Sequence, residues 1–468
     1  MELIMFFKQF YLGCLAHASY LIGSDGEAAV VDPQRDVDLY IAEAAANGLK
    51  IRYIFETHVH ADFVSGHHEL AQRTGATIVV GWRASALFPH HAARAGDSFA
   101  VGSLTLRVLE TPGHTPEGIS IVVHDSSNPA SADKVLTGDT LFIGDVGRPD
   151  LVGSKGYTPE QMAEMLYDSL HDILMSLDDR VEVFPAHGAG SLCGRNISLE
   201  TTSTIGAQRR TNHALAPMTK EQFVELATHA LPEQPAYFAI DADLNRRGVP
   251  ALDSVKRPLA MSPAEVMHEV RGGVLLLDVR PSEVYGPEHI ATSMNIGLDG
   301  QFASWAGTLI AFDRRVVIVT ESDLQVDETV MRLARIGFTS VIGYLEGGIE
   351  TWKKAGWPVA HTQQISVAEL DRRLQKNPSL QLADVRRPGE HETGIAPNAL
   401  PMSLATFEQT MERLDRHQPL YVVCGSGYRS SIATSMLESV GFNDLINVEG
   451  GMRAYNDAGY RTVVPTTA

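Results

Sequence analysis

Short apolar runs alternate with amphipathic stretches through the first half of the chain. Apolar runs bounded by glycine, proline or polar residues predict β-strands, and the stretches between them predict helices. From about residue 201 to residue 258, helical stretches and proline-containing loops predict a helical cap and a connector. We therefore expect an α/β domain over residues 1–250. Its predicted strands are 19–22, 28–32, 53–55, 77–80, 104–109, 119–123 and 181–184.

The second half contains an internal repeat of about 100 residues. The sequence Leu-Leu-Asp-Val-Arg at 276–280 recurs as Leu-Ala-Asp-Val-Arg at 382–386. Each copy alternates helices and strands, which predicts a small parallel α/β domain. Two copies are too few for a solenoid, so we interpret them as tandem duplicated domains. We call residues 258–360 the first repeat and residues 362–468 the second repeat.

Composition and charge narrow the classes of function. The 468 residues are enough for about three domains. Hydrophobic residues make up 44% and charged residues 20%, which is ordinary for a globular protein. The net charge of −19 disfavours binding to nucleic acid or to an anionic membrane, because both need a basic face. It does not exclude small anionic substrates, since a local pocket can oppose the global charge.

The cysteines and the apolar segments indicate in which cellular compartment the protein is expected. Cys14, Cys193 and Cys424 are odd in number and far apart, so a disulfide framework is not expected and a reducing cytosol fits best. The apolar residues 1–7 are too short for a signal peptide, and no stretch approaches the roughly 20 apolar residues of a membrane span. We expect a cytoplasmic homo-oligomer that binds neither nucleic acid nor membrane.

Histidines and aspartates follow several of the predicted strands. Loops at neighbouring strand ends converge when the strands lie side by side, and such loops often carry the chemistry. One histidine in such a loop is usually an ordinary polar surface residue, but a series in this order favours a metal centre. Imidazole and carboxylate together suit zinc, iron or manganese. The candidates are His58, His60, Asp62, His114, Asp139 and His187.

The order of these motifs resembles the metallo-β-lactamase superfamily over about residues 7 to 250. The resemblance implies an αβ/βα sandwich with metals at the sheet edge. The fullest superfamily motif is His-x-His-x-Asp-His and feeds two metals, whereas this chain has Phe63 in place of the last histidine. Phenylalanine has no lone pair for a metal. Losing one of about four ligands lowers the affinity for a second metal, so we expect one metal.

Within the superfamily the chain is most similar to persulfide dioxygenases, including those fused to rhodanese domains. This resemblance implies a single Fe(II) per chain held by His58, His114 and Asp139. Two histidines and one carboxylate leave open coordination positions, as the oxygen chemistry of non-haem iron requires. Three further candidates would then orient ligands or waters, or serve as ligands of a second metal; they are His60, Asp62 and His187.

Each of two further residues near these motifs has two interpretations. In the same family an arginine that matches Arg148 helps to hold glutathione, which makes Arg148 a candidate clamp for a substrate carboxylate. An ordinary surface arginine in a turn is an equally good interpretation. Cys193 follows His187 closely and is a candidate second thiol, although a buried, inert cysteine is at least as good an interpretation.

The predicted strand 420–423 leads through a glycine-rich loop into a helix. Cys424 begins this loop, where glycines let several backbone N–H groups turn inward beside the positive end of the helix. A cysteine in such a place should react as its thiolate. The rest of the loop and the start of the helix are Gly425, Ser426, Gly427, Tyr428, Arg429 and Ser430.

This segment resembles the active loop of a rhodanese, and the resemblance covers about residues 365 to 462. It implies that Cys424 accepts a sulfane sulfur as a persulfide and passes it to a nucleophile, with Arg429 in the catalytic loop. The loop of a tyrosine phosphatase has the spacing Cys-x5-Arg. The spacing here is Cys-x4-Arg, which favours sulfur chemistry over phosphate chemistry.

The first repeat departs from this pattern at the decisive position. Aligning the two repeats places Thr320 opposite Cys424, and residues 260–360 contain no cysteine. The acidic loop around Thr320 would also repel anionic substrates. We therefore expect an inactive rhodanese-like domain that serves as a spacer or an oligomer interface.

The leading hypothesis is a persulfide dioxygenase fused to a rhodanese pair. It would oxidise a low-molecular-weight persulfide such as glutathione persulfide with O2 to sulfite and thiol. Cys424 would move sulfane sulfur between persulfide, sulfite and thiosulfate. One alternative is a zinc-dependent thioester hydrolase of the glyoxalase II type with an accessory sulfurtransferase domain. Another is a sulfur carrier or scaffold whose metal is structural.

Overall fold

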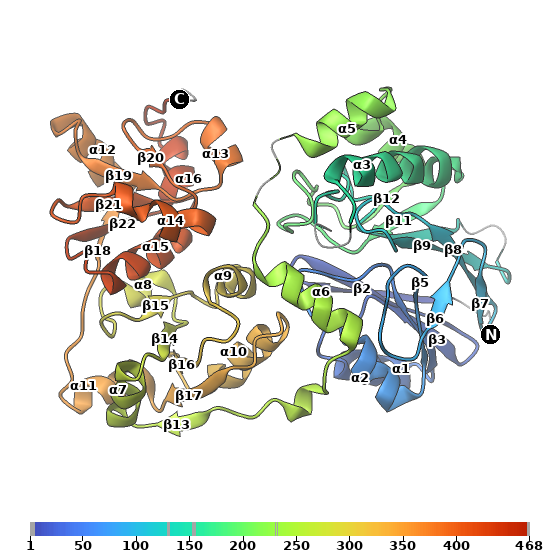
Figure 1. The fold of residues 1–468 in the computed structure, drawn as a ribbon, viewed down its shortest axis with the longest axis horizontal. Helices are drawn as coiled ribbons and strands as arrows, with labels where there is room; N and C mark the ends of the chain where they lie inside the picture. The colour runs from blue at the N-terminus through green and yellow to red at the C-terminus, as the bar shows by residue number, and fades with distance from the viewer. Residues whose placement is uncertain (1–4, 129–131, 152–155, 230, 232, 466–468) are drawn as a thin grey trace. The chain divides into compact units, whose positions relative to one another are not determined.

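The computed structural model describes residues 5–128, 132–151, 156–229, 231 and 233–465. The chain forms two compact units (Figure 1). Unit 1 comprises residues 1–255 and 334–337, and unit 2 comprises residues 256–333 and 338–468. Among the described residues, no helix is both long enough and apolar enough to cross a bilayer.

Unit 1 contains two six-stranded sheets. The first has the order β1-β2-β3-β4-β5-β6 and the second has the order β12-β11-β10-β9-β8-β7. The strands of the first sheet are β1 (Phe6–Leu12), β2 (His17–Ser24), β3 (Glu27–Val31), β4 (Lys50–Glu56), β5 (Thr77–Gly81) and β6 (His91–Ala93). Those of the second are β7 (Ser98–Val101), β8 (Leu104–Glu110), β9 (Ile119–Asp125), β10 (Lys134–Gly138), β11 (Glu182–Pro185) and β12 (Ser203–Thr204).

Helices cover the outer faces of these two sheets. The helices of unit 1 are α1 (Asp38–Ala46), α2 (His67–Thr74), α3 (Pro159–Asp168), α4 (Ile205–Thr211), α5 (Lys220–Thr228) and α6 (Tyr237–Arg247). Helix α3 begins where the sequence favours it, because Thr158 forms a capping box with Gln161 and Pro159 occupies the first turn. The helices α4 to α6 form the helical region that the sequence predicts after residue 201.

Three apolar cores define the layers of unit 1. The central core lies between the sheets and joins Tyr20 and Phe55 of the first sheet to Leu106 and Ile121 of the second. A second core packs α1 and α2 against the first sheet, and a third packs α3, α4 and α5 against the second sheet. Strand β2 is buried along its whole length, as a strand between two layers must be. The predicted αβ/βα sandwich is confirmed.

Unit 2 contains two parallel five-stranded sheets with matching strand orders, β13-β17-β16-β14-β15 and β18-β22-β21-β19-β20. The first sheet consists of β13 (Leu259–Met261), β14 (Leu275–Asp278), β15 (Met294–Asn295), β16 (Val316–Val319) and β17 (Val341–Leu345). The second consists of β18 (Gln363–Ser366), β19 (Gln381–Asp384), β20 (Leu400–Pro401), β21 (Leu420–Val423) and β22 (Leu445–Glu449). The matching orders confirm the internal duplication.

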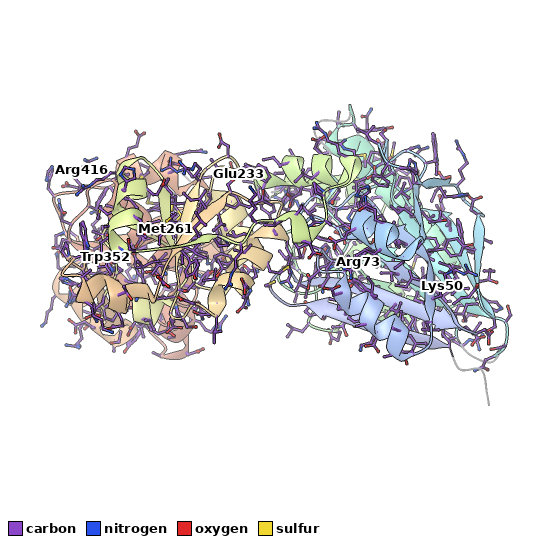
Figure 2. All side chains as sticks on the ribbon, turned by 90° about the horizontal axis from the view of Figure 1, so that it is seen from below. Lys50, Arg73, Glu233, Met261, Trp352 and Arg416 are labelled. Carbon is purple, nitrogen blue, oxygen red and sulfur yellow. The ribbon has the colours of Figure 1, made fainter. Side chains whose placement is uncertain are left out.

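Each repeat has its own helices and its own core. In the first repeat Met261 and Trp352 belong to one buried cluster (Figure 2). Its helices are α7 (Pro263–Arg271), α8 (Ser282–Tyr285), α9 (Phe302–Leu309), α10 (Gln325–Ala334) and α11 (Gly348–Lys354). The second repeat has α12 (Val367–Lys376), α13 (Pro388–Glu392), α14 (Phe407–Thr410), α15 (Tyr428–Ser439) and α16 (Gly451–Asp457).

Candidate metal centre and cysteine loop

Three buried side chains from separate strand-end loops of unit 1 converge. His58 follows β4, His114 follows β8 and Asp139 follows β10, and their ligand-type atoms all lie within 4.8 Å of one another. Asp139 Oδ2 lies 3.8 Å from His58 Nε2 and 3.5 Å from His114 Nε2. The three residues that the sequence predicts as metal ligands are therefore brought together.

Hydrogen bonds on the far side of each ring orient the two imidazoles. The Thr57 hydroxyl donates to Asp32 Oδ2 at 2.9 Å, so it accepts from His58 Nδ1 at 3.0 Å. His114 Nδ1 donates to the carbonyl oxygen of Arg148 at 2.9 Å. Each Nδ1 therefore carries the proton, and each Nε2 presents a lone pair toward Asp139, as a metal ligand must.

The charge state of this cluster also suits a metal. Burial lowers the pKa of His58 well below its ordinary value, and nearby His60 adds to the effect. Burial likewise lowers the pKa of His114. For Asp139 burial would raise the pKa, but His187 outweighs it, and the net shift is downward. Two neutral imidazoles and one carboxylate are the protonation states in which these groups bind metals.

Two glycines allow the loops to come this close. A Cβ at Gly113, whose φ is 145°, would lie 2.3 Å from Cα of Leu166 in α3. A Cβ at Gly147 would lie 2.0 Å from the carbonyl oxygen of Asp139 and 2.9 Å from His114 Nδ1. Larger residues at these two positions would push the loop of His114 and the segment after Asp139 away from the cluster.

Phe63 fills the place beside the cluster with an apolar ring. It is 0% exposed, and its ring centroid lies 4.1 Å from that of His17 and 4.5 Å from that of His60. Asn245 of α6 fixes the loop, because its amide donates to the carbonyl oxygens of His60 at 2.8 Å and Phe63 at 2.7 Å. Phe63 is thus a packed core residue that offers no lone pair.

His60 is held by carboxylates on the other side of its ring. Its Nε2 lies 3.1 Å from Asp32 Oδ1 and 3.5 Å from Glu56 Oε2. Burial alone would lower the pKa of His60, but these two carboxylates outweigh burial and raise it to about 9. His60 groups with Asp32 and Glu56 rather than with the three converging residues. This arrangement agrees with an orienting role.

His187 bridges two aspartates. Its Nδ1 lies 2.8 Å from Asp139 Oδ1, and its Nε2 lies 2.9 Å from Asp62 Oδ2. Burial opposes a charge on His187, but Asp139 and then Asp62 raise its pKa well above the ordinary value. Asp62, His187 and Cys193 form a second buried group of ligand-type atoms. Burial, together with the two aspartates, raises the pKa of the Cys193 thiol.

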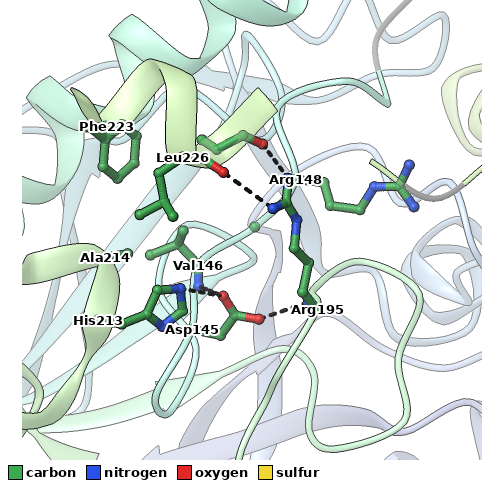
Figure 3. A pocket seen from close by; sticks show the side chains of 10 residues that line it. Asp145, Val146, Arg148, Arg195, His213, Ala214, Phe223 and Leu226 are labelled. Carbon is green, nitrogen blue, oxygen red and sulfur yellow. Dashed lines mark hydrogen bonds and ion pairs between the residues drawn. The ribbon is translucent and has the colours of Figure 1, made fainter. Parts of the chain in front are cut away.

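Arg148 already has a strong partner. Its guanidinium donates to both carboxylate oxygens of Asp150, at 2.9 and 2.7 Å, and the side chain is buried. It lines a small cavity of about 30 Å³ beside α5, together with Arg195 (Figure 3). Contact with a substrate carboxylate stays a prediction. What the structure adds is the role of its carbonyl oxygen in orienting His114.

The sequence interpretation missed three buried polar residues around the centre. Asp32 ends the apolar run of β3 and receives hydrogen bonds from the backbone and hydroxyl of Thr57. Glu56 ends β4, and its carboxylate accepts from Ser65 at 2.7 Å. His17, in β2, has no hydrogen-bond partner for either ring nitrogen among the described residues. An acidic residue at the end of an apolar strand was the available signal for Asp32 and Glu56.

The cysteine loop lies in unit 2, between β21 and α15. Cys424 is 0% exposed, and its Sγ accepts from the backbone N–H of Gly427 at 3.1 Å and from the Ser430 hydroxyl at 3.4 Å. Gly427 has φ 111°, which turns its N–H toward the sulfur. Two donors therefore face the sulfur of a cysteine at a helix start, and one of them is a backbone N–H, where the sequence predicts several.

Arg429 of this loop is paired with a carboxylate. Its guanidinium donates to both oxygens of Glu390 in α13, at 2.6 and 2.8 Å. Burial would lower the pKa of Arg429, but Glu390 outweighs it and the net shift is upward. Glu390 was not singled out by the sequence.

The first repeat carries Thr320 in the equivalent place. Thr320 directly follows β16, just as Cys424 follows β21, and the two strands occupy the same position in sheets of the same order. The Thr320 hydroxyl donates to the carbonyl oxygen of Ser322 at 2.9 Å. This loop holds no sulfur atom that could carry a persulfide.

The family follows from these features and from comparison with known proteins. Residues 12–187 match the metallo-β-lactamase superfamily, and residues 262–355 and 366–458 each match the rhodanese-like domain. The chain belongs to the metallo-β-lactamase superfamily and carries two rhodanese-like domains after the sandwich.

Individual relatives are similar over different shares of the chain. The mitochondrial persulfide dioxygenase of Bos taurus is 31% identical, over 48% of this chain and 82% of that protein. A hydroxyacylglutathione hydrolase of Anaeromyxobacter dehalogenans is 35% identical, over 36% of this chain and 60% of that protein. The crystal structure of a metallo-β-lactamase from Staphylococcus aureus is 32% identical, covers 73% of this chain and 99% of that one, and has a TM-score of 0.65.

Proposed function

We propose that the protein oxidises a low-molecular-weight persulfide, such as glutathione persulfide, at a mononuclear iron centre. The overall reaction is RSSH + O2 + H2O → RSH + SO3²⁻ + 2 H⁺. The observation that carries this proposal is the convergence of two imidazoles and one carboxylate beside a position filled by Phe63. The similarity to a persulfide dioxygenase supports it.

The donor set of the cluster fits Fe(II). Two neutral imidazole nitrogens and one carboxylate oxygen face one another, while the other polar atoms of the three side chains hold protein partners. Fe(II) held by His58, His114 and Asp139 would supply open positions for the substrate sulfur and for O2. A structural zinc site normally has four protein ligands, which disfavours a purely structural role.

The surrounding residues prepare the cluster. His187 Nδ1 lies 2.8 Å from Asp139 Oδ1 and 2.9 Å from Asp139 Oδ2, and so it holds the carboxylate beside the two imidazoles. The packed ring of Phe63 stands where the two-metal motif of the superfamily has a histidine, and it offers no lone pair there. The absence of this ligand favours one metal over the two that a hydrolytic site would use.

The second half of the proposed function is sulfur transfer at Cys424. The thiolate attacks the outer sulfur of a persulfide or of thiosulfate, and the thiolate RS⁻ or sulfite leaves. The resulting Cys424 persulfide gives its outer sulfur to sulfite or to a thiol and regenerates the thiolate. Support comes from the N–H and O–H donors at Sγ, which favour the anionic sulfur.

An oxygen electrode tests the first reaction. Protein purified with iron should consume O2 with glutathione persulfide and form one sulfite for each O2, counted as free sulfite plus the thiosulfate made from it at Cys424. No O2 consumption by iron-loaded protein, or O2 consumption with neither sulfite nor thiosulfate formed, would contradict the proposal. Omitting the persulfide provides the background rate.

One observation favours a second candidate function. Asp62, His187 and Cys193 form a separate group of ligand-type atoms, and a hydroxyacylglutathione hydrolase is among the relatives. The second candidate is a hydrolase that binds two zinc ions, one at each group of ligand-type atoms, and hydrolyses a glutathione thioester. Thioester hydrolysis measured without O2 separates it from the dioxygenase.

A further inference from the structure

Helix α15, which follows the cysteine loop, is enclosed along most of its length. Its residues from Ser430 to Leu437 are all buried, although four of them carry hydroxyl groups. A helix of one small α/β domain usually buries one face and exposes the other. Buried hydroxyl groups need hydrogen-bond partners, and part of these partners comes from the first repeat.

Asn295 of the first repeat connects its sheet to the middle of α15. The Ser431 hydroxyl donates to Asn295 Oδ1 at 2.6 Å, and the Asn295 backbone N–H donates to Ser435 Oγ at 2.9 Å. The Asn295 amide donates to the carbonyl oxygens of Asp278 and Arg280 in its own repeat. One side chain thus ties β14 and β15 to the face of α15 that starts at the cysteine loop.

Tyr428 anchors the first residue of α15 in the same repeat. Its hydroxyl donates to the carbonyl oxygen of Gly297 at 2.8 Å. Its ring packs directly against the backbone of Gly300, where an added Cβ would lie 2.5 Å from the ring. Tyr428 directly follows Gly427, whose N–H donates to the sulfur of Cys424. The anchor therefore acts on the part of the loop that faces the thiol.

A third contact holds the other end of the helix. Glu438 accepts from the backbone N–H of Thr292 at 3.1 Å and lies 3.2 Å from His289 Nε2. The contacts at Tyr428, Ser431 and Glu438 span nearly all of α15. They fix both its position along its own axis and its rotation about that axis.

We propose that the first repeat is the positioning element of the sulfur-transfer site: through Asn295 and Gly297 it holds α15 and Tyr428 so that the Gly427 N–H and the Ser430 hydroxyl face Cys424. This inference rests on the proposed role of Cys424 in sulfur transfer. It explains why a repeat that has Thr320 in place of the cysteine keeps a complete fold, because its β15 edge serves the neighbouring loop. Tyr428 and Asn295 act as positioning residues, since neither contacts the sulfur.

The test is the pH profile of Cys424 alkylation in the full-length Tyr428→Phe variant. Iodoacetamide reacts with the thiolate and needs no sulfur substrate, so this readout is independent of whether Cys424 transfers sulfur. Loss of the hydroxyl anchor should move the midpoint of the profile upward by about half a pH unit or more. The kcat for thiosulfate-dependent transfer should fall about three- to tenfold, with KM changed less.

Tyr20→Phe is the matched control. Tyr20 is a buried tyrosine of unit 1 whose hydroxyl donates to the carbonyl oxygen of Pro185 at 2.6 Å, and that bond involves no residue of either repeat. It removes the same kind of bond and should leave the alkylation profile unchanged. An unchanged profile in Tyr428→Phe, or an equal shift in both variants, would overturn the proposal.

A double-mutant cycle of Asn295→Ala and Ser431→Ala adds a second measurement that does not depend on Tyr428. If the first repeat positions the loop through this pair, the effects on the alkylation midpoint should be non-additive. Additive effects would also overturn the proposal. If the unaltered protein showed no sulfur-transfer activity, the proposed function would be contradicted. The alkylation results would still decide whether the first repeat positions the loop.

Discussion

The metal centre and the cysteine loop are both buried, but they are assembled differently. The candidate metal centre draws His58, His114 and Asp139 from loops after three separate strands. The cysteine loop takes the donors around Cys424 from one short segment, 424–430. The first arrangement depends on how the two sheets of unit 1 pack together, and the second depends on the local backbone and on what holds α15. The comparison predicts two activities that can be removed one at a time.

The largest effect is expected from Cys424→Ser. Serine keeps the size of the side chain but cannot carry a sulfane sulfur, so thiosulfate-dependent transfer should fall by roughly a thousandfold or more. Persulfide-dependent O2 consumption should remain, because no residue of the metal cluster changes. Both rates are measured on the same preparation, and a loss of O2 consumption would show that the two sites are not separable.

Asp139→Asn is the corresponding test at the other site. It removes the carboxylate from the cluster and takes away the partner of His187, so the affinity for iron should fall by at least about a hundredfold. Metal content and O2 consumption should fall together, while transfer at Cys424 stays at the level of the unaltered protein. Full iron content in the variant would mean that Asp139 is not a ligand.

Phe63→His tests whether the missing histidine is the reason why a second metal ion is not expected. A histidine at this position would add a nitrogen donor next to Asp62 in the chain, among the rings of His17 and His60, so the affinity for a second zinc ion should rise by about tenfold. Zinc titration followed by equilibrium dialysis measures the stoichiometry. Phe63→Leu, which stays apolar, is the control, and equal stoichiometry in the two variants would show that another feature blocks the site.

The smallest effect is expected from the ion pair of the cysteine loop. Arg429 holds the pKa of Glu390 below its ordinary value of 4.5 even though burial opposes this shift. A lowered folded-state pKa contributes stability that is present above pH 4.5 and is lost as the pH falls below it. After screening by solvent the contribution should be at most about 1 kcal/mol. Urea unfolding of Glu390→Gln should therefore differ from the unaltered protein at pH 7 and converge with it in acid.

The sequence was sufficient for residues whose local pattern carries the signal. His58, His114 and Asp139 each stand just after an apolar run, and Cys424 stands between an apolar run and glycines. It was not sufficient for Asp32 or Asn295, because their partners lie far away in the chain. Asp32 contacts His60 across 28 positions and Asn295 contacts Ser431 across 136. Such contacts depend on which strands become neighbours, and a single sequence does not state this.

Arg148 marks an intermediate case. The family resemblance makes its side chain a candidate substrate clamp, and in the structure the guanidinium pairs with Asp150, only two positions away. The opposite charge nearby was visible in the sequence. The contribution of its carbonyl oxygen to the orientation of His114 was not, because any residue offers a carbonyl and only the fold decides where it points.

The most direct test of the central claim is a metal analysis and an activity assay on one and the same sample of purified protein. The account predicts about one iron per chain, with O2 consumption that depends on glutathione persulfide and scales with the iron content. Two zinc ions per chain, with hydrolysis of a glutathione thioester and no O2 consumption, would contradict it.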